Sequence, residues 1–234
     1  MDTEDSVLAN DALEYIKAHR AELIDHFCPA ETCHAATSPI SLFMAGSPGA
    51  GKTEVSKGLI KKFEDIPMRI DADEIRAFCP GYSGTNAHVF QDAANKGVNI
   101  LYDHALENSI NCILDGTFAY ADVVQNIERS LKRARRVEIW FVYQDPKTAW
   151  AFTKAREVVE SRRVAKNVFI RALFKSRDNA KMVKEKFGSS VELNILLKNY
   201  STGQEELWLN RQAQDLDHLA NGSYSAEELE HELI

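Results

Sequence analysis

Residues 40–53 read ISLFMAGSPGAGKT, and this stretch decides the fold. The apolar run 40–45 is typical of a buried strand, and it leads directly into a glycine-rich turn. The turn has the pattern G, four residues, G, K and then S or T, and residues 52–63 continue with helical composition. Strand, glycine-rich loop and helix in this order predict a P-loop, in which backbone N–H groups and a helix N-terminus hold phosphates.

Each part of this loop has a chemical role. The glycines permit backbone conformations and a close approach that a Cβ would block. Lys52 would reach the β- and γ-phosphates of ATP, and Thr53 would place its hydroxyl on Mg²⁺. An ordinary glycine-rich turn is the alternative, which the flanking strand and helix disfavour. The predicted nucleotide-binding residues are Gly46, Ser47, Pro48, Gly49, Ala50, Gly51, Lys52 and Thr53.

The rest of the chain alternates between strand and helix patterns. Alternation of this kind predicts an α/β fold with a mostly parallel central sheet flanked by helices. Before the first strand, residues 6–27 have the apolar spacing of an amphipathic helix. Further strands are expected at 68–71, 110–115, 137–143 and 192–197, and further helices at 86–108, 123–132, 147–159 and 227–234.

Composition excludes several classes of protein. The 234 residues suit one α/β domain with additions, and 35 acidic against 28 basic residues give a net charge of −7. This balance argues against a broad nucleic-acid or anionic-membrane surface. The acidic N-terminus does not resemble a targeting signal, and the apolar run 137–143 is too short to span a bilayer. We therefore expect a soluble, cytoplasmic protein without a membrane partner.

The four cysteines follow no disulfide framework, which favours a reducing compartment. Cys112 lies in a predicted buried strand, where a thiol behaves as a small apolar group. Zinc binding by His26, Cys28, Cys33 and His34 is disfavoured, because their spacing matches no familiar zinc pattern.

Carboxylates follow the second and third predicted strands. The carboxyl ends of parallel strands meet at one edge of the sheet, so Asp71, Asp73 and Asp115 should lie near the phosphate loop. Asp73 is the candidate to accept a proton from an attacking hydroxyl, although either Asp71 or Asp73 could instead only cap the following helix. Asp115 could orient Mg²⁺, bind substrate hydroxyls together with Thr117, or simply form an Asp-Gly turn.

Arginines after the fourth strand could close over the γ-phosphate. Arg156 is followed by Arg162 and Arg163, and a guanidinium offers paired donors with a permanent charge. Periodicity does not decide between Arg162 and Arg163. They open a basic stretch, 160–187, which is either a solvated helix face or part of an arginine-rich lid over the phosphates.

Together, GSPGAGKT, IDADEIR, the DGT strand end, and Arg156 followed by SRRVAKN resemble the zeta-toxin family of small-molecule kinases over residues 38–175. The resemblance implies a P-loop kinase fold and phosphorylation of UDP-N-acetylglucosamine by ATP, with an antitoxin partner that blocks the nucleotide site. It assigns catalysis to Lys52, Asp73, Arg156 and Arg162, and favours Arg162 because Lys166 matches the family spacing.

Two acceptor-side positions depart from the family. Asp115 stands where the family has Glu before Gly-Thr, and Asn99 stands where UDP-sugar kinases carry another Glu. The resemblance makes Asn99, Asp115 and Thr117 the substrate-binding residues and assigns Thr53 to Mg²⁺. Asp115 is the second metal-binding candidate because it ends an apolar strand, the usual Walker-B position. Because both departures are on the acceptor side, a kinase is predicted more firmly than its sugar-nucleotide substrate.

The predicted organisation is an N-terminal helical extension (1–37), a kinase core (38–200) and a C-terminal helical tail packed on the core (201–234). Two other functions use the same loop. A nucleotide-dependent switch would hydrolyse ATP without an acceptor, and a polynucleotide 5'-hydroxyl kinase would need a cationic groove, for which the basic stretch is the candidate.

Overall fold

A computed structural model describes residues 3–219 and 224–233 of the chain. Their strands form one six-stranded sheet in the order β2-β3-β1-β4-β5-β6, parallel except for the last pair. This confirms the predicted α/β class with a mostly parallel sheet. The strands are β1 (Ile40–Ala45), β2 (Met68–Asp71), β3 (Cys112–Asp115), β4 (Arg136–Gln144), β5 (Glu192–Asn199) and β6 (Gln204–Trp208).

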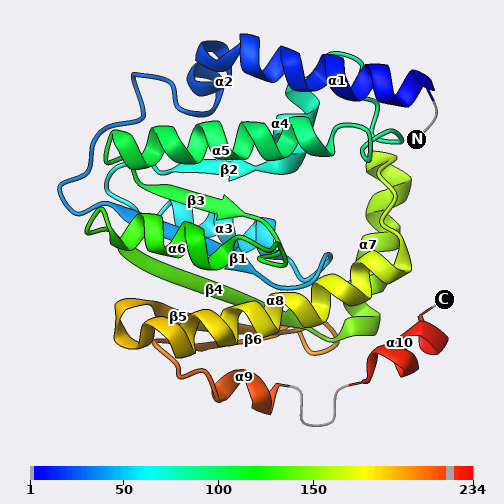
Figure 1. The fold of residues 1–234 in the computed structure, drawn as a ribbon. Helices are drawn as coiled ribbons and strands as arrows, with labels where there is room; N and C mark the ends of the chain where they lie inside the picture. Colours follow the sequence, from blue (N-terminus) through cyan, green and yellow to red (C-terminus); the bar gives the residue numbers. More distant parts are fainter. Residues whose placement is uncertain (1–2, 220–223, 234) are drawn as a thin grey trace.

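Helices cover both faces of this sheet (Figure 1). Those before β4 are α1 (Thr3–Ala18), α2 (Arg20–Phe27), α3 (Lys52–Ile60), α4 (Ala72–Phe78), α5 (Gln91–Glu107) and α6 (Val123–Leu131). Those after it are α7 (Pro146–Glu160), α8 (Lys166–Phe187), the 3-10 turn η1 (Gly188–Ser190), α9 (Asp215–His218) and α10 (Ala226–Glu232).

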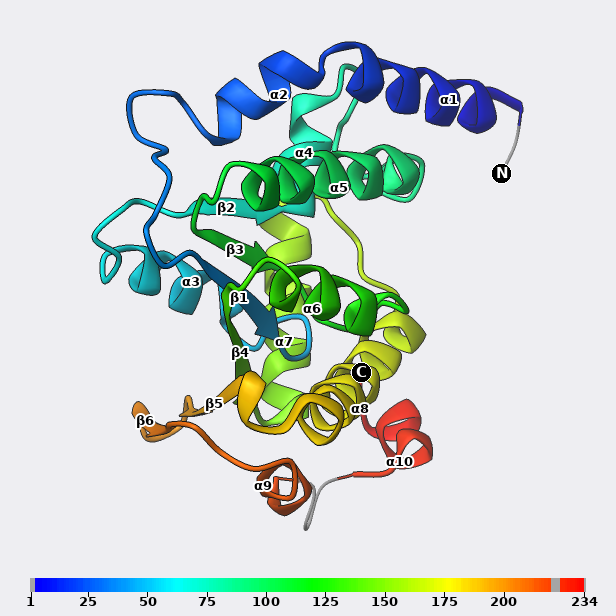
Figure 2. The ribbon, with the colours of Figure 1, turned by 60° about the vertical axis from the view of Figure 1, so that its left-hand side comes forward.

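The two faces bury cores of different size. Helices α5, α6 and α8 lie on one face, and α1 and α2 form a further layer over α5 (Figure 1). Phe43, Ile139 and Ile195 from the strands belong to this larger core. Helix α3 lies on the opposite face (Figure 2). There its Leu59 packs with the buried Ile113 in a smaller core. The sheet is therefore buried on both sides, as parallel sheets are.

The expected helix boundaries differ from the observed ones at two places. The N-terminal helix is divided into α1 and α2 at His19. Helix α5 begins at Gln91 rather than near residue 86, because the Asn86 side chain holds a turn by accepting from the Ser83 N–H and donating to the Gly81 carbonyl. Asparagine side chains commonly stabilise turns in this way.

The C-terminal segment departs from the expected helical tail. Residues 204–208 form β6, which pairs antiparallel with β5 at the edge of the sheet. The segment therefore contributes to the sheet instead of only packing on it. The predicted final helix is α10, which ends at Glu232, while Ile234 lies outside the described residues.

The expectation that the cysteines are unpaired was wrong for two of the four. Cys28 and Cys33 form a disulfide, because a turn in which the Cys33 N–H donates to the Pro29 carbonyl brings them together. Their thiolates are therefore not available to the zinc site considered above. Cys112 is buried in β3, as predicted. Within the described ranges no helix is long and apolar enough to cross a membrane.

The glycine-rich loop between β1 and α3 packs tightly against helix α7. Gly49 has φ of +72°, and a Cβ built there would lie 2.0 Å from the Ala149 carbonyl oxygen. Gly46 is equally constrained, with φ of +133° and a Cβ position 2.3 Å from the Val142 carbonyl oxygen. Only glycine fits such positions without moving backbone. The loop is thus positioned by β4 and α7 as well as by its own strand.

We expect Gly49→Ala to lower the free energy of unfolding by about 2 kcal/mol or more, because it adds backbone strain and a clash with α7. Gly58→Ala is the matched control. Gly58 lies inside α3 with nothing near its Cβ position, so alanine should stabilise the helix by up to about 1 kcal/mol. Urea denaturation of the two variants measures both values, and equal effects would contradict the close packing described here.

Candidate active site

The carboxyl ends of β1, β2 and β3 bring the predicted site residues to one edge of the sheet. The glycine-rich loop follows β1, and Asp71 and Asp115 end the two neighbouring strands in direct register. Thr117 also contacts the loop, because its carbonyl accepts a hydrogen bond from the Gly46 N–H at 3.2 Å. Parallel topology therefore assembles the phosphate loop and the strand-end carboxylates as expected.

Lys52 is buried at the start of α3. Its ammonium donates to the Ser47 carbonyl at 2.6 Å, so it lies folded back over the loop. Burial lowers the pKa of Lys52 to about 8, although Asp115 acts to raise it, and the charge of Arg156 lowers it further. Arg156, an exposed residue of α7, is thus near enough for its charge to act on Lys52. Such a concentration of positive charge favours a phosphate ligand.

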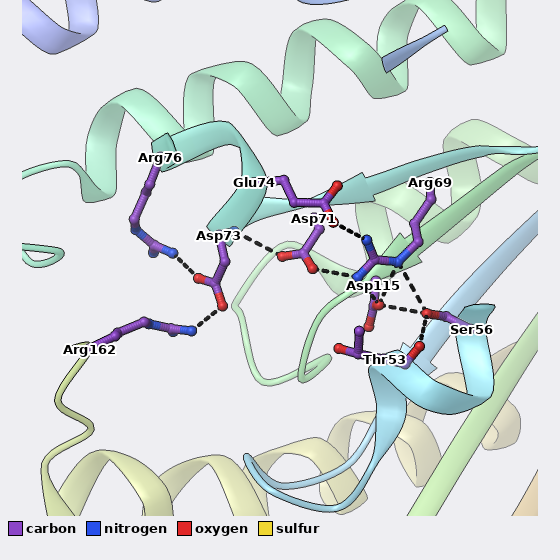
Figure 3. A network of polar contacts seen from close by, with 9 residues as sticks. All are labelled: Thr53, Ser56, Arg69, Asp71, Asp73, Glu74, Arg76, Asp115 and Arg162. Atoms are coloured by element: carbon purple, nitrogen blue, oxygen red, sulfur yellow. Dashed lines mark hydrogen bonds and ion pairs between the residues drawn. The ribbon is translucent and has the colours of Figure 1, made fainter. Parts of the chain in front are cut away.

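Asp73, in the first turn of α4, lies between two arginines (Figure 3). Arg76 reaches one carboxylate oxygen of Asp73 from the next turn of the helix, and Arg162 reaches the other from the segment between α7 and α8. The side chain of Asp73 remains one-third exposed. Arg163 is exposed, and its charge lies near Glu157. Of the two arginines that periodicity did not separate, Arg162 is the one at this edge of the sheet.

Asp71 caps the helix that carries Asp73. One of its oxygens accepts from the Asp73 N–H at 2.8 Å, and the other accepts from Arg69 Nη2 at 2.5 Å. Burial raises the pKa of Asp71 to about 6, and the charge of Asp73 adds to this shift. The capping role considered for either aspartate thus belongs to Asp71, and Asp73 projects further out.

Asp115 is buried and has one oxygen fully engaged. Its Oδ2 accepts from Ser56 Oγ at 2.6 Å and from Nε and Nη2 of Arg69 at 2.9 and 2.6 Å. Its other oxygen makes no hydrogen bond to the described residues. This arrangement fits a Mg²⁺ ion held by nucleotide phosphates and the Thr53 hydroxyl, with Asp115 offering a single oxygen to it or to a water on it.

Asn99 is the predicted site residue that the structure does not bring to the others. It lies in the middle of α5 with its side chain exposed, and no hydrogen bond within the described residues connects it to this edge. Helix α5 begins at the site and runs away from it, so Gln91 is the residue that reaches in. Its side chain accepts from Arg76 at 2.7 Å.

Three lysines of the basic stretch are held by other parts of the fold. Lys181 pairs with Asp217, Lys186 pairs with Glu128, and Lys184 donates to backbone carbonyls at the end of α8. These cations therefore hold α8 to α6 and α9. The hypothesis that the stretch forms a lid or a strand-binding groove is not supported beyond Arg162 and its neighbours.

The sequence patterns do not single out Arg69 or Arg76. In the structure, Arg69 contacts Asp71 and Asp115, and Arg76 contacts Asp73. Arg69 alternates with Met68 and Ile70 in a short buried strand, which is an unusual place for a charge. This signal was available in the sequence. Arg76 could be predicted only from its three-residue spacing to Asp73, which places both side chains on one side of a helix.

Because the pKa of Lys52 is lowered, its buried positive charge should destabilise the folded protein at neutral pH. Lys52→Met should raise the free energy of unfolding by about 1–3 kcal/mol at pH 7 without nucleotide, because the buried charge is removed. Above pH 8 the folded protein releases this proton while the unfolded chain keeps it until about pH 10.5, so wild-type stability recovers and the difference shrinks. Urea denaturation of both proteins at pH 7 and pH 10 measures this difference in the free energy of unfolding.

Lys57→Met, at an exposed position of α3, is the control and should leave stability nearly unchanged. A Lys52→Met variant that is less stable than wild type at pH 7 would show that the buried Lys52 charge does not destabilise the fold.

Similar proteins were found by structure and by family. A chain of the PezAT chromosomal toxin–antitoxin system of Streptococcus pneumoniae superposes with a TM-score of 0.69 at 20% identity, over 93% of this chain and 90% of that one. A chain of the AvrRxo1-ORF1:AvrRxo1-ORF2 complex with sulphate ions superposes with a TM-score of 0.59 at 13% identity, over 90% and 70%. These likenesses show the shared fold.

No curated protein matches the chain. The family model described as zeta toxin, however, matches residues 25–212. This match covers most of the chain and includes the glycine-rich loop, the strand-end aspartates, Arg156 and Arg162. The chain therefore belongs to the zeta toxin family.

Proposed function

We propose that this protein is an ATP-dependent kinase that transfers the γ-phosphate to a hydroxyl of a small nucleotide-linked metabolite, with UDP-N-acetylglucosamine or a related nucleotide sugar as acceptor. Family membership supports phosphoryl transfer, and the carboxylate edge beside the glycine-rich loop supports an alcohol acceptor. ATP would bind on Gly46–Thr53, with Lys52 on the transferred phosphate.

The observation that carries this proposal is the position of Asp73 between Arg76 and Arg162. Asp73 would accept the proton of the attacking hydroxyl, which a kinase needs in line with the γ-phosphate. In this structure the carboxylate of Asp73 is the anion that Arg162 contacts. When ATP binds, its γ-phosphate would compete for Arg162, which would leave Asp73 free to act as a base. Arg156 would then share the charge of the transferring group with Arg162.

Bound Mg²⁺ would neutralise charge on the phosphates, held by Thr53 and assisted by Asp115. Thr117 lies beside the glycine-rich loop through its bond to Gly46, which suits a contact to the acceptor. Asn99 is the least supported of the proposed acceptor residues, because it is exposed in the middle of α5. Only the family resemblance assigns Asn99 to the acceptor. A sugar nucleotide would have to extend along α5 to contact it.

We also propose that the protein acts as a toxin controlled by an antitoxin. Its family is described as zeta toxin, and a chain of similar fold comes from a toxin–antitoxin system. Depletion of an acceptor that cells need would account for toxicity.

Radiolabel transfer tests the kinase. With γ-labelled ATP and Mg²⁺, the wild type should label UDP-N-acetylglucosamine, and a metabolite extract analysed in parallel reveals any other acceptor. Asp73→Asn should slow transfer by about 100-fold or more, because general-base catalysis is lost. Asp178→Asn, at an exposed position of α8, is the matched control and should transfer at the wild-type rate.

A folded Asp73→Asn variant with near wild-type transfer would show that the assigned mechanism is wrong. Loss of ATP without any labelled acceptor would instead favour the nucleotide-dependent switch.

Toxicity is tested separately by growth. Induced expression of the wild type should arrest a bacterial culture, whereas Lys52→Ala, which cannot hold the phosphates, should grow as the empty vector does. The Lys57→Ala variant, altered at an exposed lysine of the same helix, should remain toxic. Arrest by Lys52→Ala at equal protein level would separate toxicity from phosphoryl transfer.

A further inference from the structure

Arg69 is the most highly connected side chain at the carboxyl edge of the sheet (Figure 3). Its guanidinium donates to Asp115 through Nε and Nη2, to Asp71 through Nη2 and to Glu74 through Nη1. Nε also lies 3.2 Å from Ser56 Oγ. One side chain therefore links β2, β3, α3 and α4. Only 9% of it is exposed, so it is not available to a ligand in solution.

The two carboxylates that Arg69 joins could not remain together without a cation. Asp71 and Asp115 are in direct register on neighbouring strands, and their side chains are 14% and 2% exposed. Buried carboxylates so close must share a proton or bind a positive charge. Burial acts to lower the pKa of Arg69, but Asp115 and Asp71 raise it overall, so its charge is permanent.

A strand-end carboxylate beside a glycine-rich loop ordinarily faces a metal ion with oxygen ligands. Here the space between the two carboxylates is filled by a planar guanidinium whose donors saturate Asp115 Oδ2. No cluster of three or more metal-binding side chains exists among residues 3–219 and 224–233. The protein thus supplies at this position, from its own chain, the charge that a divalent ion could otherwise provide.

We propose that Arg69 is a positioning residue that acts as a built-in cation between Asp71 and Asp115, in place of a protein-bound divalent metal. If Arg69 replaces the metal in this way, the site takes up Mg²⁺ only together with a nucleotide. The joint uptake of Mg²⁺ and nucleotide rests on the proposed function, whereas the replacement of a metal by Arg69 does not. Arg69 also fixes Asp71, whose other oxygen caps the N–H of Asp73, so it sets the position of the proposed base.

Binding of Mn²⁺ alone, without nucleotide, tests the proposal. Electron paramagnetic resonance measures the concentrations of free and bound Mn²⁺, and circular dichroism verifies the fold of each variant. Wild type should bind Mn²⁺ weakly. Arg69→Met should bind one ion at least about tenfold more tightly, because two facing carboxylates are then left without a cation. Arg69→Lys, which keeps a positive charge, should bind as weakly as wild type.

The double variant Arg69→Met with Asp71→Asn should lose the new site, which assigns it to this pair of carboxylates. If Arg69→Met does not fold alone, Arg69→Gln is used, and Mn²⁺ but not NaCl at the same ionic strength should restore its fold. Equal Mn²⁺ binding by wild type and Arg69→Met would overturn the proposal, as would a variant that neither binds Mn²⁺ nor folds in its presence. Because no phosphoryl transfer is measured, these outcomes are independent of the proposed kinase activity.

Discussion

Parallel pairing of β1 with β3 and β4 is the constraint on which the rest of this structure depends. It brings the glycine-rich loop and the ends of β2 and β3 to one edge, so that phosphate-binding backbone and carboxylates become neighbours. It also requires the sheet to be covered on both faces. The large core under α5, α6 and α8 and the smaller core under α3 meet that requirement. The site is therefore a consequence of the topology.

The Lys52 and Arg162 cations at this edge have hydrogen-bonding partners within the chain. The Lys52 ammonium is satisfied by the Ser47 carbonyl, and Arg162 is satisfied by the Asp73 carboxylate. Both cations are thus held by partners that a phosphate can replace. The Arg69 group differs, because its guanidinium donates to three carboxylates at once and two of them, Asp71 and Asp115, are largely buried. One half of the site can therefore exchange its partners, while the other half is fixed.

Family membership and geometry constrain different parts of the function. The zeta toxin match covers residues 25–212 and supports the donor side, where the glycine-rich loop and the arginines lie. On the acceptor side, Asp115 is tied to Arg69 and Ser56, and Asn99 is exposed on α5. Asp115 and Asn99 are also the two positions at which the sequence departs from the family resemblance.

The sequence alone determined the strand–loop–helix unit, the α/β class and the edge on which the carboxylates lie, because hydrophobic periodicity and glycine-rich turns are local signals. It did not predict β6, the Cys28–Cys33 disulfide or the internal pairing of the α8 lysines. The lysine pairs depend on partners distant in sequence, whereas β6 and the disulfide depend on turns that no sequence pattern identifies. The contacts of Arg162 with Asp73 and of Arg69 with Asp115 also depend on partners distant in sequence, although the family resemblance by itself favours Arg162 over Arg163. Which cation meets which carboxylate is a property of tertiary packing, since a side chain's partner depends on where other strands and helices place theirs.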